Sequence, residues 1–267
     1  MESVDEEAPL LGTARAFPLM RENRRFTANL AITFAHDFVR LAERAPMFLA
    51  ESELAYFTGL EHDRRRRSYL LGRCAAKLAL QQSLAEPDLR ALEIGSGVFG
   101  QPLVLHASRA TPGVTISHSV DLAVAFAFPA GHPMGVDLER IDPERLDTIR
   151  SVMSRRERAW ADHSDPVTLS TLVWTAKEAL SKVLLCGLMS PWAILSVGEL
   201  QPRGARVWEG RFENFAQYKF FSWASRFYLM SVVLPKNSMY AGDESAFDAI
   251  VARALDRHLP GLHEEAA

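Results

Sequence analysis

The chain has 267 residues, of which 48% are hydrophobic and 24% charged, and its formal net charge is −3. These values are ordinary for a globular protein, so they exclude collagen-like, disordered and low-complexity chains. At about 150 residues per domain, the length allows one large domain or two small ones. The nearly balanced charge argues against a dedicated nucleic-acid-binding protein.

The cysteine content and the N-terminus point to one cellular environment. The only two cysteines, Cys74 and Cys186, lie in apolar stretches without metal-ligand spacing, so neither a disulfide framework nor a zinc site is expected. The opening MESVDEEAPLL lacks the features of a secretory signal, and no apolar run approaches the roughly 20 residues that span a bilayer. We expect a soluble cytoplasmic protein with no membrane partner.

The order of turn residues predicts three segments. Residues 1–25 carry scattered proline, glycine and charge without periodicity, so we expect a flexible N-terminal arm. An N-terminal half follows over residues 26–130, and the breaker PAGHP at 129–133 separates it from a C-terminal half over 131–260.

The N-terminal half begins with helical patterns and ends with strand patterns. Residues 51–84 predict a helix in two pieces that meet near Gly59, and the second piece carries four consecutive arginines at 64–67. At 100° per residue, Arg66, Arg73 and Lys77 share one face, which predicts a basic ridge. From 93 to 128, glycine-rich turns and short apolar runs predict strands.

The C-terminal half alternates differently. A strand, MGVDLE, precedes a helix that Asp142 and Pro143 open and that we expect to run through Trp160. Asp165 and Pro166 cap the next helix, which Gly187 closes. Residues 195–234 predict several antiparallel strands, and 243–259 predict a terminal amphipathic helix.

A literal GxGxxG occurs at Gly95, Gly97 and Gly100. The dinucleotide-binding form of this motif needs a helix to begin at its third glycine, but Gln101 and Pro102 follow here and lead into strands. The sequence therefore favours a flexible or ligand-facing turn.

The strand GVDLE points two carboxylates to one face. Asp137 and Glu139 lie two residues apart and so share a side, while Val136 and Leu138 face the core. Convergent carboxylates suit Mg²⁺, which prefers oxygen ligands. A half-solvated strand with acidic residues outside is the commoner explanation of such a pair taken alone.

Three residues of the capped helix extend this pattern. Trp174, Glu178 and Lys182 are spaced i, i+4 and i+8 on the polar face. Glu178 and Lys182 could be an ordinary surface pair, but a tryptophan on a polar face needs a cover. If this face meets the GVDLE strand, three carboxylates and a lysine form one site. The turn Ser117–His118–Ser119 could likewise bind an anion or be an ordinary polar hairpin entry.

Taken together, the ordered motifs RRSYLLGRCAAK, GVFGQP, ISHS, GVDLE and WTAKEALSK resemble those of the 4′-phosphopantetheinyl transferases, of the large surfactin-synthetase-activator type. The resemblance covers about residues 53–190. It implies an α+β fold, a monomeric pseudo-dimer of two similar α+β halves, with coenzyme A as co-substrate and Mg²⁺ bound in the cleft between the halves. No nucleic acid is expected as a partner.

The resemblance also implies roles for individual residues. Asp137, Glu139 and Glu178 correspond to Mg²⁺ ligands, and Lys182, Ser117 and His118 to groups that contact the coenzyme A phosphates. The remaining implied coenzyme contacts are Arg73, Lys177 and the loop Gly100, Gln101 and Pro102, where Gln101 replaces the usual basic residue and only backbone contacts carry over. The family's upstream phosphate-binding arginine is not obvious, and Arg66 or Arg67 could substitute for it.

The implied reaction transfers 4′-phosphopantetheine from coenzyme A to a serine of an apo acyl or peptidyl carrier protein and releases adenosine 3′,5′-bisphosphate. Glu178 is the first choice of general base, with Glu139 or a metal-bound water as alternatives, while Lys182 and His118 would stabilise the departing charge. Two rivals stay open: another Mg²⁺-dependent phosphoryl-transfer or pyrophosphate-cleaving enzyme, and an inactive coenzyme A-binding homologue. The carrier and its pathway, from fatty-acid to secondary-metabolite synthesis, are not indicated.

Overall fold

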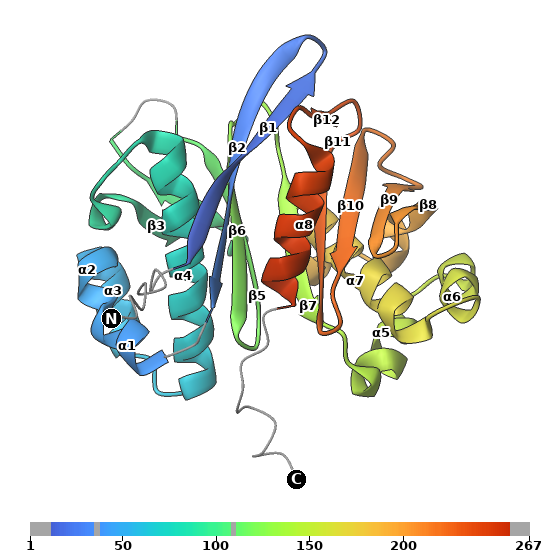
Figure 1. The fold of residues 1–267 in the computed structure, drawn as a ribbon. Helices are drawn as coiled ribbons and strands as arrows, with labels where there is room; N and C mark the ends of the chain where they lie inside the picture. Colours follow the sequence, from blue (N-terminus) through green and yellow to red (C-terminus); the bar gives the residue numbers. More distant parts are fainter. Residues whose placement is uncertain (1–11, 35–37, 108–110, 257–267) are drawn as a thin grey trace, which may run out of the picture.

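Two five-stranded antiparallel sheets form the frame of the molecule (Figure 1). The structure is a computed structural model that describes residues 12–34, 38–107 and 111–256. The first sheet has the order β12-β1-β2-β6-β5 and consists of Met239–Tyr240 (β12), Thr13–Arg21 (β1), Arg24–Phe34 (β2), Leu122–Phe128 (β6) and Gly113–Ser119 (β5). The second has the order β7-β11-β10-β9-β8 and consists of Gly135–Arg140 (β7), Tyr228–Pro235 (β11), Tyr218–Ala224 (β10), Val207–Phe212 (β9) and Val197–Gly204 (β8). A separate hairpin pairs Glu93–Ser96 (β3) with Pro102–Leu105 (β4).

Helices pack on the outer faces of the two sheets, except for the last helix, which lies between the sheets. In the first half they are Phe38–Glu43 (α1), Ala45–Phe48 (α2), Glu51–Thr58 (α3) and Asp63–Leu84 (α4). In the second half they are Leu146–Ser151 (α5), Arg155–Asp162 (α6), Pro166–Val183 (α7) and Glu244–Leu255 (α8). The long helix α4 packs on β2 and β6, and α7 packs on β7 and β11. Helix α8 lies between the two sheets (Figure 1).

The sequence of β6, LAVAFAF, shows how the layers are separated. Its large residues Leu122, Val124 and Phe126 face a core that both sheets and α8 share. The alanines between them face α4 and its core. This period of two gives the helix side a surface of methyl groups, and it lets α4 pack close to the sheet. Opposite faces of one strand thus build two different cores.

The two halves repeat one arrangement. Each half begins with a strand, passes through short helices to a long helix and returns through antiparallel strands, so that β2-β6-β5 corresponds to β7-β11-β10. The repeat reaches side chains: Lys77 of α4 pairs with Glu53 of α3, and Lys177 of α7 pairs with Glu157 of α6. The predicted α+β fold of two similar halves is confirmed.

Several predicted elements differ in the structure. Residues 13–25, expected within a flexible arm, form β1, a two-residue turn and the start of β2, because Phe17 and Leu19 alternate into the shared core. The expected helix from Asp142 to Trp160 is instead a 3₁₀ turn (Pro143–Arg145), α5 and α6, since Ser154 caps α6 with Glu157 in a capping box. Residues 1–11 of the arm and 257–259 of the terminal helix lie outside the described residues.

The start of the capped helix agrees with its prediction, because the Asp165 side chain accepts a hydrogen bond from the Thr168 N–H and Pro166 occupies the first turn. Its end differs: α7 ends at Val183 rather than at Gly187, and Leu185 already has a left-handed φ of +55°. Over the described part of the chain, no helix is both long enough and apolar enough to cross a bilayer.

Candidate active site

The two sheets meet where the edge strands β5 and β7 run beside each other. Backbone N–H groups of β7 donate to side-chain hydroxyls of β5 rather than to backbone carbonyls. The three bonds are Val136 to Thr115 at 3.2 Å, Leu138 to Ser117 at 3.1 Å and Arg140 to Ser119 at 3.0 Å. Both strands have a period of two, so each second residue takes part. We call this contact the hydroxyl seam.

Asp137 sits on the seam with one oxygen paired and one unpaired. Its Oδ1 accepts from Ser117 Oγ at 2.8 Å and from Lys182 Nζ at 2.8 Å. Its Oδ2 is buried and has no hydrogen-bond partner in the structure. A buried carboxylate oxygen without a donor is costly, which marks it as an atom that awaits a ligand.

Lys182 joins the second half's long helix to the seam. Besides Asp137, its Nζ donates to the Val136 carbonyl at 2.8 Å and the Ile116 carbonyl at 3.2 Å. These carbonyls belong to β7 and β5, so one ammonium group contacts both halves. The helix face that carries Lys182, on which the spacing also places Glu178, therefore lies toward the seam.

Glu139 is held at both oxygens. Arg145 Nη1 donates to Oε2 at 2.5 Å, and Trp174 Nε1 donates to Oε1 at 3.3 Å. The Trp174 ring stacks on Trp192, with centroids 4.6 Å apart and planes at 27°. The cover that the sequence requires for Trp174 is thus another segment of the chain, the 3₁₀ turn Trp192–Leu195.

Glu178 has a carboxyl group whose pKa lies well above its ordinary value. Burial is the main cause that raises its pKa to about 7, and the neighbouring carboxylate of Asp137 raises it further. Glu139 also raises this pKa, whereas Lys182 and Arg145 lower it. The three predicted acids therefore lie within electrostatic range of one another, and the two cations offset them incompletely.

These residues fit a hard divalent cation. As the side chains stand, no group of three His, Cys, Asp or Glu residues within the described ranges is arranged to hold a metal ion. Internal cations take that place, because Lys182 pairs with Asp137 and Arg145 pairs with Glu139. The unpaired Asp137 Oδ2 and the like-charge repulsion on Glu178 both favour a further cation, and all the donors are oxygen atoms.

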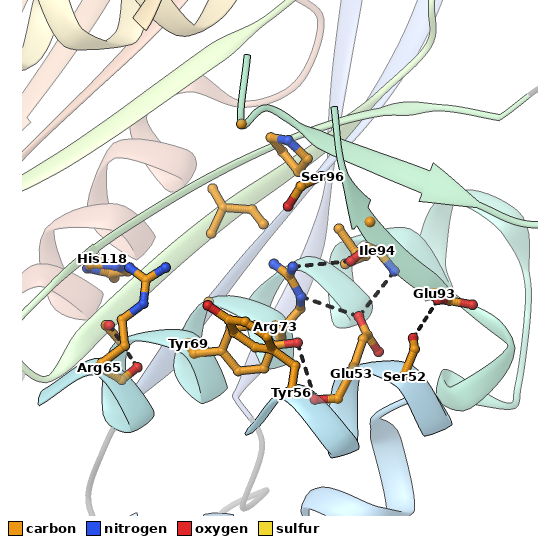
Figure 2. Close-up of a pocket in the computed structure, with 16 residues that line it drawn as sticks. Ser52, Glu53, Tyr56, Arg65, Tyr69, Arg73, Glu93, Ile94, Ser96 and His118 are labelled. Carbon is orange, nitrogen blue, oxygen red and sulfur yellow. Dashed lines mark hydrogen bonds and ion pairs between the residues drawn. The ribbon is translucent and has the colours of Figure 1, made fainter. Parts of the chain in front are cut away.

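A polar cavity of about 410 Å³ opens in the first half (Figure 2). It lies between α4, the β3–β4 hairpin and β5. Its cationic wall consists of Arg65 and Arg73, and His118 is at the Arg65 end. The cleft walls lower the pKa of His118 by desolvation, with Lys182 as a smaller cause, so the imidazole is neutral near pH 7. The cavity therefore offers two permanent positive charges and a neutral imidazole to an anion.

A buried acid fixes the position of Arg73 in this cavity. Glu53 lies 3.3 Å from Arg73 Nε and 2.6 Å from Lys77 Nζ, and it accepts from the Ile94 N–H at 3.1 Å. Arg73 also donates to the Ile94 carbonyl and lies over the Tyr69 ring, 4.7 Å from its centroid. Lys77 is fully buried, so the predicted basic ridge does not include it.

A second, apolar cavity of about 470 Å³ lies across the seam. It shares Gly100, Pro102 and Ile116 with the polar cavity, and Lys182 lines it. Aliphatic and aromatic side chains dominate its remaining walls, including Phe99, Leu103, Phe128, Met134, Val183 and Leu185. The charged and apolar chambers thus adjoin at Gly100, Pro102 and Ile116, and the Ile116 carbonyl accepts a hydrogen bond from Lys182, the partner of Asp137.

The turn GVFGQP forms the partition between the two cavities. Gly100 has φ +77°, which glycine adopts without strain. The Gln101 side chain accepts from the Phe99 N–H at 2.9 Å and so holds its own turn. The Gln101 side chain is thus engaged within the turn, and the expected backbone contacts of this loop with a coenzyme stay a prediction.

Three predicted coenzyme contacts are placed differently. Arg66 stacks over Phe57 at 5.0 Å and does not line either cavity, whereas the neighbouring Arg65 does. Lys177 is buried, with Nζ 2.8 Å from Glu157 and 3.2 Å from the Val152 carbonyl, so it is not brought to the seam. The Ser117 hydroxyl is buried and donates to Asp137, which leaves its predicted phosphate contact a prediction.

Arg65, Tyr69 and Glu53 line the polar cavity but were not among the predicted site residues. The helical spacing of Arg65, Tyr69 and Arg73 at i, i+4 and i+8 is a readable signal for one face of α4. Glu53 carries no such signal, because it lies on another helix.

Comparison with known proteins finds a family model that matches part of the chain. Residues 133–233 match the family model described as the 4′-phosphopantetheinyl transferase superfamily. The chain is also similar to a solved structure of a holo-(acyl-carrier-protein) synthase from Bacillus anthracis str. Ames in complex with CoA (3′,5′-ADP). The match covers 43% of this chain and 96% of the synthase chain, with 21% sequence identity and a TM-score of 0.35. No curated protein matches the chain. The family segment contains β7 and α7, and hence the three acids and Lys182.

Proposed function

We propose that this chain, whose residues 133–233 match the family model of the 4′-phosphopantetheinyl transferase superfamily, transfers 4′-phosphopantetheine from coenzyme A to a serine of an apo carrier protein. The observation that carries this proposal is the position of Asp137. It keeps one buried oxygen unpaired, and its lysine partner both lines the apolar cavity and donates to the carbonyl of Ile116, which lines the apolar and the cationic cavity alike.

Coenzyme A has two chemically different ends, and the two cavities match them. The nucleotide end carries phosphates, which suit Arg65, Arg73 and His118 in the polar cavity. The pantetheine arm is neutral and partly apolar, and it suits the walls of the apolar cavity. The pyrophosphate that joins the ends would then lie beside Lys182.

A divalent cation held by Asp137, Glu139 and Glu178 would neutralise pyrophosphate oxygens. The side chains of this chain carry the remaining roles. Lys182 places its positive charge beside the phosphate oxygens, and neutral His118 donates one N–H to the departing nucleotide. Glu178, with a pKa near 7, is suited to accept the serine proton. The serine oxygen forms a bond to the phosphorus that carries pantetheine, the pyrophosphate P–O bond breaks, and adenosine 3′,5′-bisphosphate leaves with that electron pair.

The test is incubation of the chain with coenzyme A, MgCl₂ and a panel of apo carrier proteins. Mass spectrometry should show a gain of one phosphopantetheine group on the carrier, and a carrier whose target serine is alanine should gain none. Glu178→Gln and Asp137→Ala should abolish the gain without unfolding the protein.

The two rival functions give different products. A pyrophosphate-cleaving enzyme would release adenosine 3′,5′-bisphosphate without any carrier, and an inactive homologue would bind coenzyme A without cleaving it. If no carrier in the panel gains mass while either behaviour is seen, the transferase proposal is wrong.

A further inference from the structure

Glu139 differs from the other two acids because its two oxygens contact a partly exposed cation, Arg145, and the stacked ring of Trp174. We propose that Arg145 competes with the divalent cation for Glu139: Arg145 pairs with this carboxylate in the metal-free protein and is displaced when the cation binds. Trp174 positions Glu139 during this exchange. The inference rests on the proposed function, since it describes how the same site takes up its metal.

The contacts of Glu139 separate a fixed side from an exchangeable side. An indole N–H only donates, and the Trp174 ring is held by its stack on Trp192, so Oε1 stays fixed. Oε2 is bound by Arg145, whose side chain is 37% exposed. Arg145 ends a 3₁₀ turn of three residues, outside any long helix. Oε2 is therefore the oxygen that a metal can reach once Arg145 withdraws.

Lys182 is less suited to such an exchange. Its Nζ has three acceptors, on β5, β7 and Asp137, and it belongs to the long helix α7. Withdrawal of Lys182 would leave two seam carbonyls without their donor. Withdrawal of Arg145 would free one edge of one carboxylate and end its contact with the Trp174 ring, whose centroid lies 5.7 Å from the guanidinium carbon. Arg145 can move into solvent at a smaller cost.

The charge of the site favours the same exchange. When all three carboxylates are ionised, as metal ligation requires, they carry −1 in total together with Lys182 and Arg145. A divalent cation would bring this to +1 if Arg145 remained, and to zero if Arg145 left. Neutrality inside a partly buried cluster is favoured, because uncompensated charge is poorly solvated there.

The experiment measures metal binding by the full chain without coenzyme A or carrier. Mn²⁺ is the probe, followed by electron paramagnetic resonance, with Mg²⁺ calorimetry in parallel. Arg145→Gln should bind Mn²⁺ about threefold to tenfold more tightly, because the competing ion pair is gone. Arg145→Lys should show a smaller gain, since it keeps the charge but loses the planar fork.

Matched variants distinguish competition from a structural role. Arg203 also contacts carboxylates, Glu209 and Glu244, and lies over an aromatic ring, but it is remote from the seam; Arg203→Gln should leave Mn²⁺ affinity unchanged. Glu139→Gln should weaken Mn²⁺ binding, and adding Arg145→Gln to it should give no further gain. Trp174→Phe should weaken binding, because the N–H that orients Glu139 is lost.

Unchanged or weaker Mn²⁺ binding by folded Arg145→Gln would overturn the proposal. If that variant does not fold, the same outcome in Arg145→Lys overturns it. Failure of the transferase assay alone would not, because the metal titration does not depend on transfer. Conversely, transferase activity combined with unchanged Mn²⁺ affinity in Arg145→Gln would support the proposed function and overturn the competition by Arg145.

Discussion

Helices α4 and α7 occupy equivalent places in the two halves and differ at the positions that matter for chemistry. Their sequences align at an offset of 100 residues, so that the buried Lys77 corresponds to the buried Lys177. One position further, α4 has Leu78 where α7 has Glu178. Their neighbouring strands differ in the same way, since β2 contains no acid and β7 contains Asp137 and Glu139. The shared residues hold the scaffold, and the unshared ones make the candidate site.

This comparison assigns the two lysines of the WTAKEALSK motif to different tasks. Lys177 repeats the Lys77–Glu53 pair, and its partner Glu157 accepts from the Val197 N–H just as Glu53 accepts from the Ile94 N–H. Lys182 corresponds to Gln82 in α4. Lys182 pairs with Asp137 at the hydroxyl seam, whereas Gln82 carries no charge that could form such a pair. Position in the repeat thus separates a buried structural lysine from the lysine of the candidate site.

The largest expected effect follows from giving α7 the residue that α4 has. Lys182→Gln should lower the rate of phosphopantetheine transfer by about 10²- to 10³-fold, because a fixed positive charge beside the pyrophosphate is lost. The matched change in the other half, Gln82→Lys, should leave the rate within twofold, a margin of about 0.4 kcal/mol. Initial rates by carrier mass spectrometry measure both, with thermal unfolding as a check of the fold. Equal losses in the two variants would contradict the assignment.

The shared lysines should differ in their contribution to stability. Lys177→Met should cost about 3 to 5 kcal/mol of unfolding free energy, because Glu157 is left buried without a countercharge. Lys77→Met should cost less, since Arg73 still lies 3.3 Å from Glu53. Urea unfolding measures both. Lys177→Met with Glu157→Gln should recover much of the loss, and a double variant as unstable as the single one would argue against charge burial as the cause.

Substitutions of Arg65 and Arg66 test which of these neighbouring arginines belongs to the candidate site in the first half. Arg65→Gln should weaken binding of adenosine 3′,5′-bisphosphate by about tenfold, because one charged hydrogen bond to a phosphate is lost. Arg66→Gln should have little effect, since Arg66 stacks on Phe57 away from the cavity. Calorimetry decides between them, and a larger effect at Arg66 would restore the role that the motif alone assigns to it.

The smallest effect concerns the link between the halves. His132 is buried, its Nε2 lies 2.7 Å from Ser238 Oγ, and desolvation lowers its pKa to about 4. The unfolded chain takes up a proton on this imidazole near pH 6.5, whereas the folded chain stays neutral until about pH 4. Stability from this group is therefore complete above pH 6.5 and is lost as the pH falls from 6.5 to 4.

The control for this prediction is His132→Asn, which does not titrate. Unfolding free energies from urea titrations at pH 7, 6 and 5 should fall more steeply for the natural protein than for the variant. Parallel slopes would show that His132 contributes nothing to the pH dependence.

The parts of the fold that local rules determine were predictable. Asp165 and Pro166 begin α7 as expected, and alternation in GVDLE separates the acids from the core. The break before α6 also had a local signal, the capping pair Ser154 and Glu157, which the continuous-helix prediction overlooked.

What sequence could not supply depends on contacts between distant segments. Lys177 looks like a functional lysine until Glu157, twenty residues away, is seen to pair with it. Arg66 and Arg65 are indistinguishable in a run of four arginines, and the aromatic ring of Phe57 decides which one turns away from the cavity. The repeat of the two halves lies in the order of strands and in a few buried pairs, so residue identity alone does not show it.

The hydroxyl seam also bears on how the protein avoids aggregation. Strands β5 and β7 are each the last strand of a sheet, and a terminal strand with free N–H groups is a template for pairing with other chains. Thr115, Ser117 and Ser119 occupy those N–H groups of β7 with side chains, which cannot extend into a continuous ladder. The residues that align the two halves thus also blunt an edge, and loss of the seam exposes that edge of β7 together with the acids it carries.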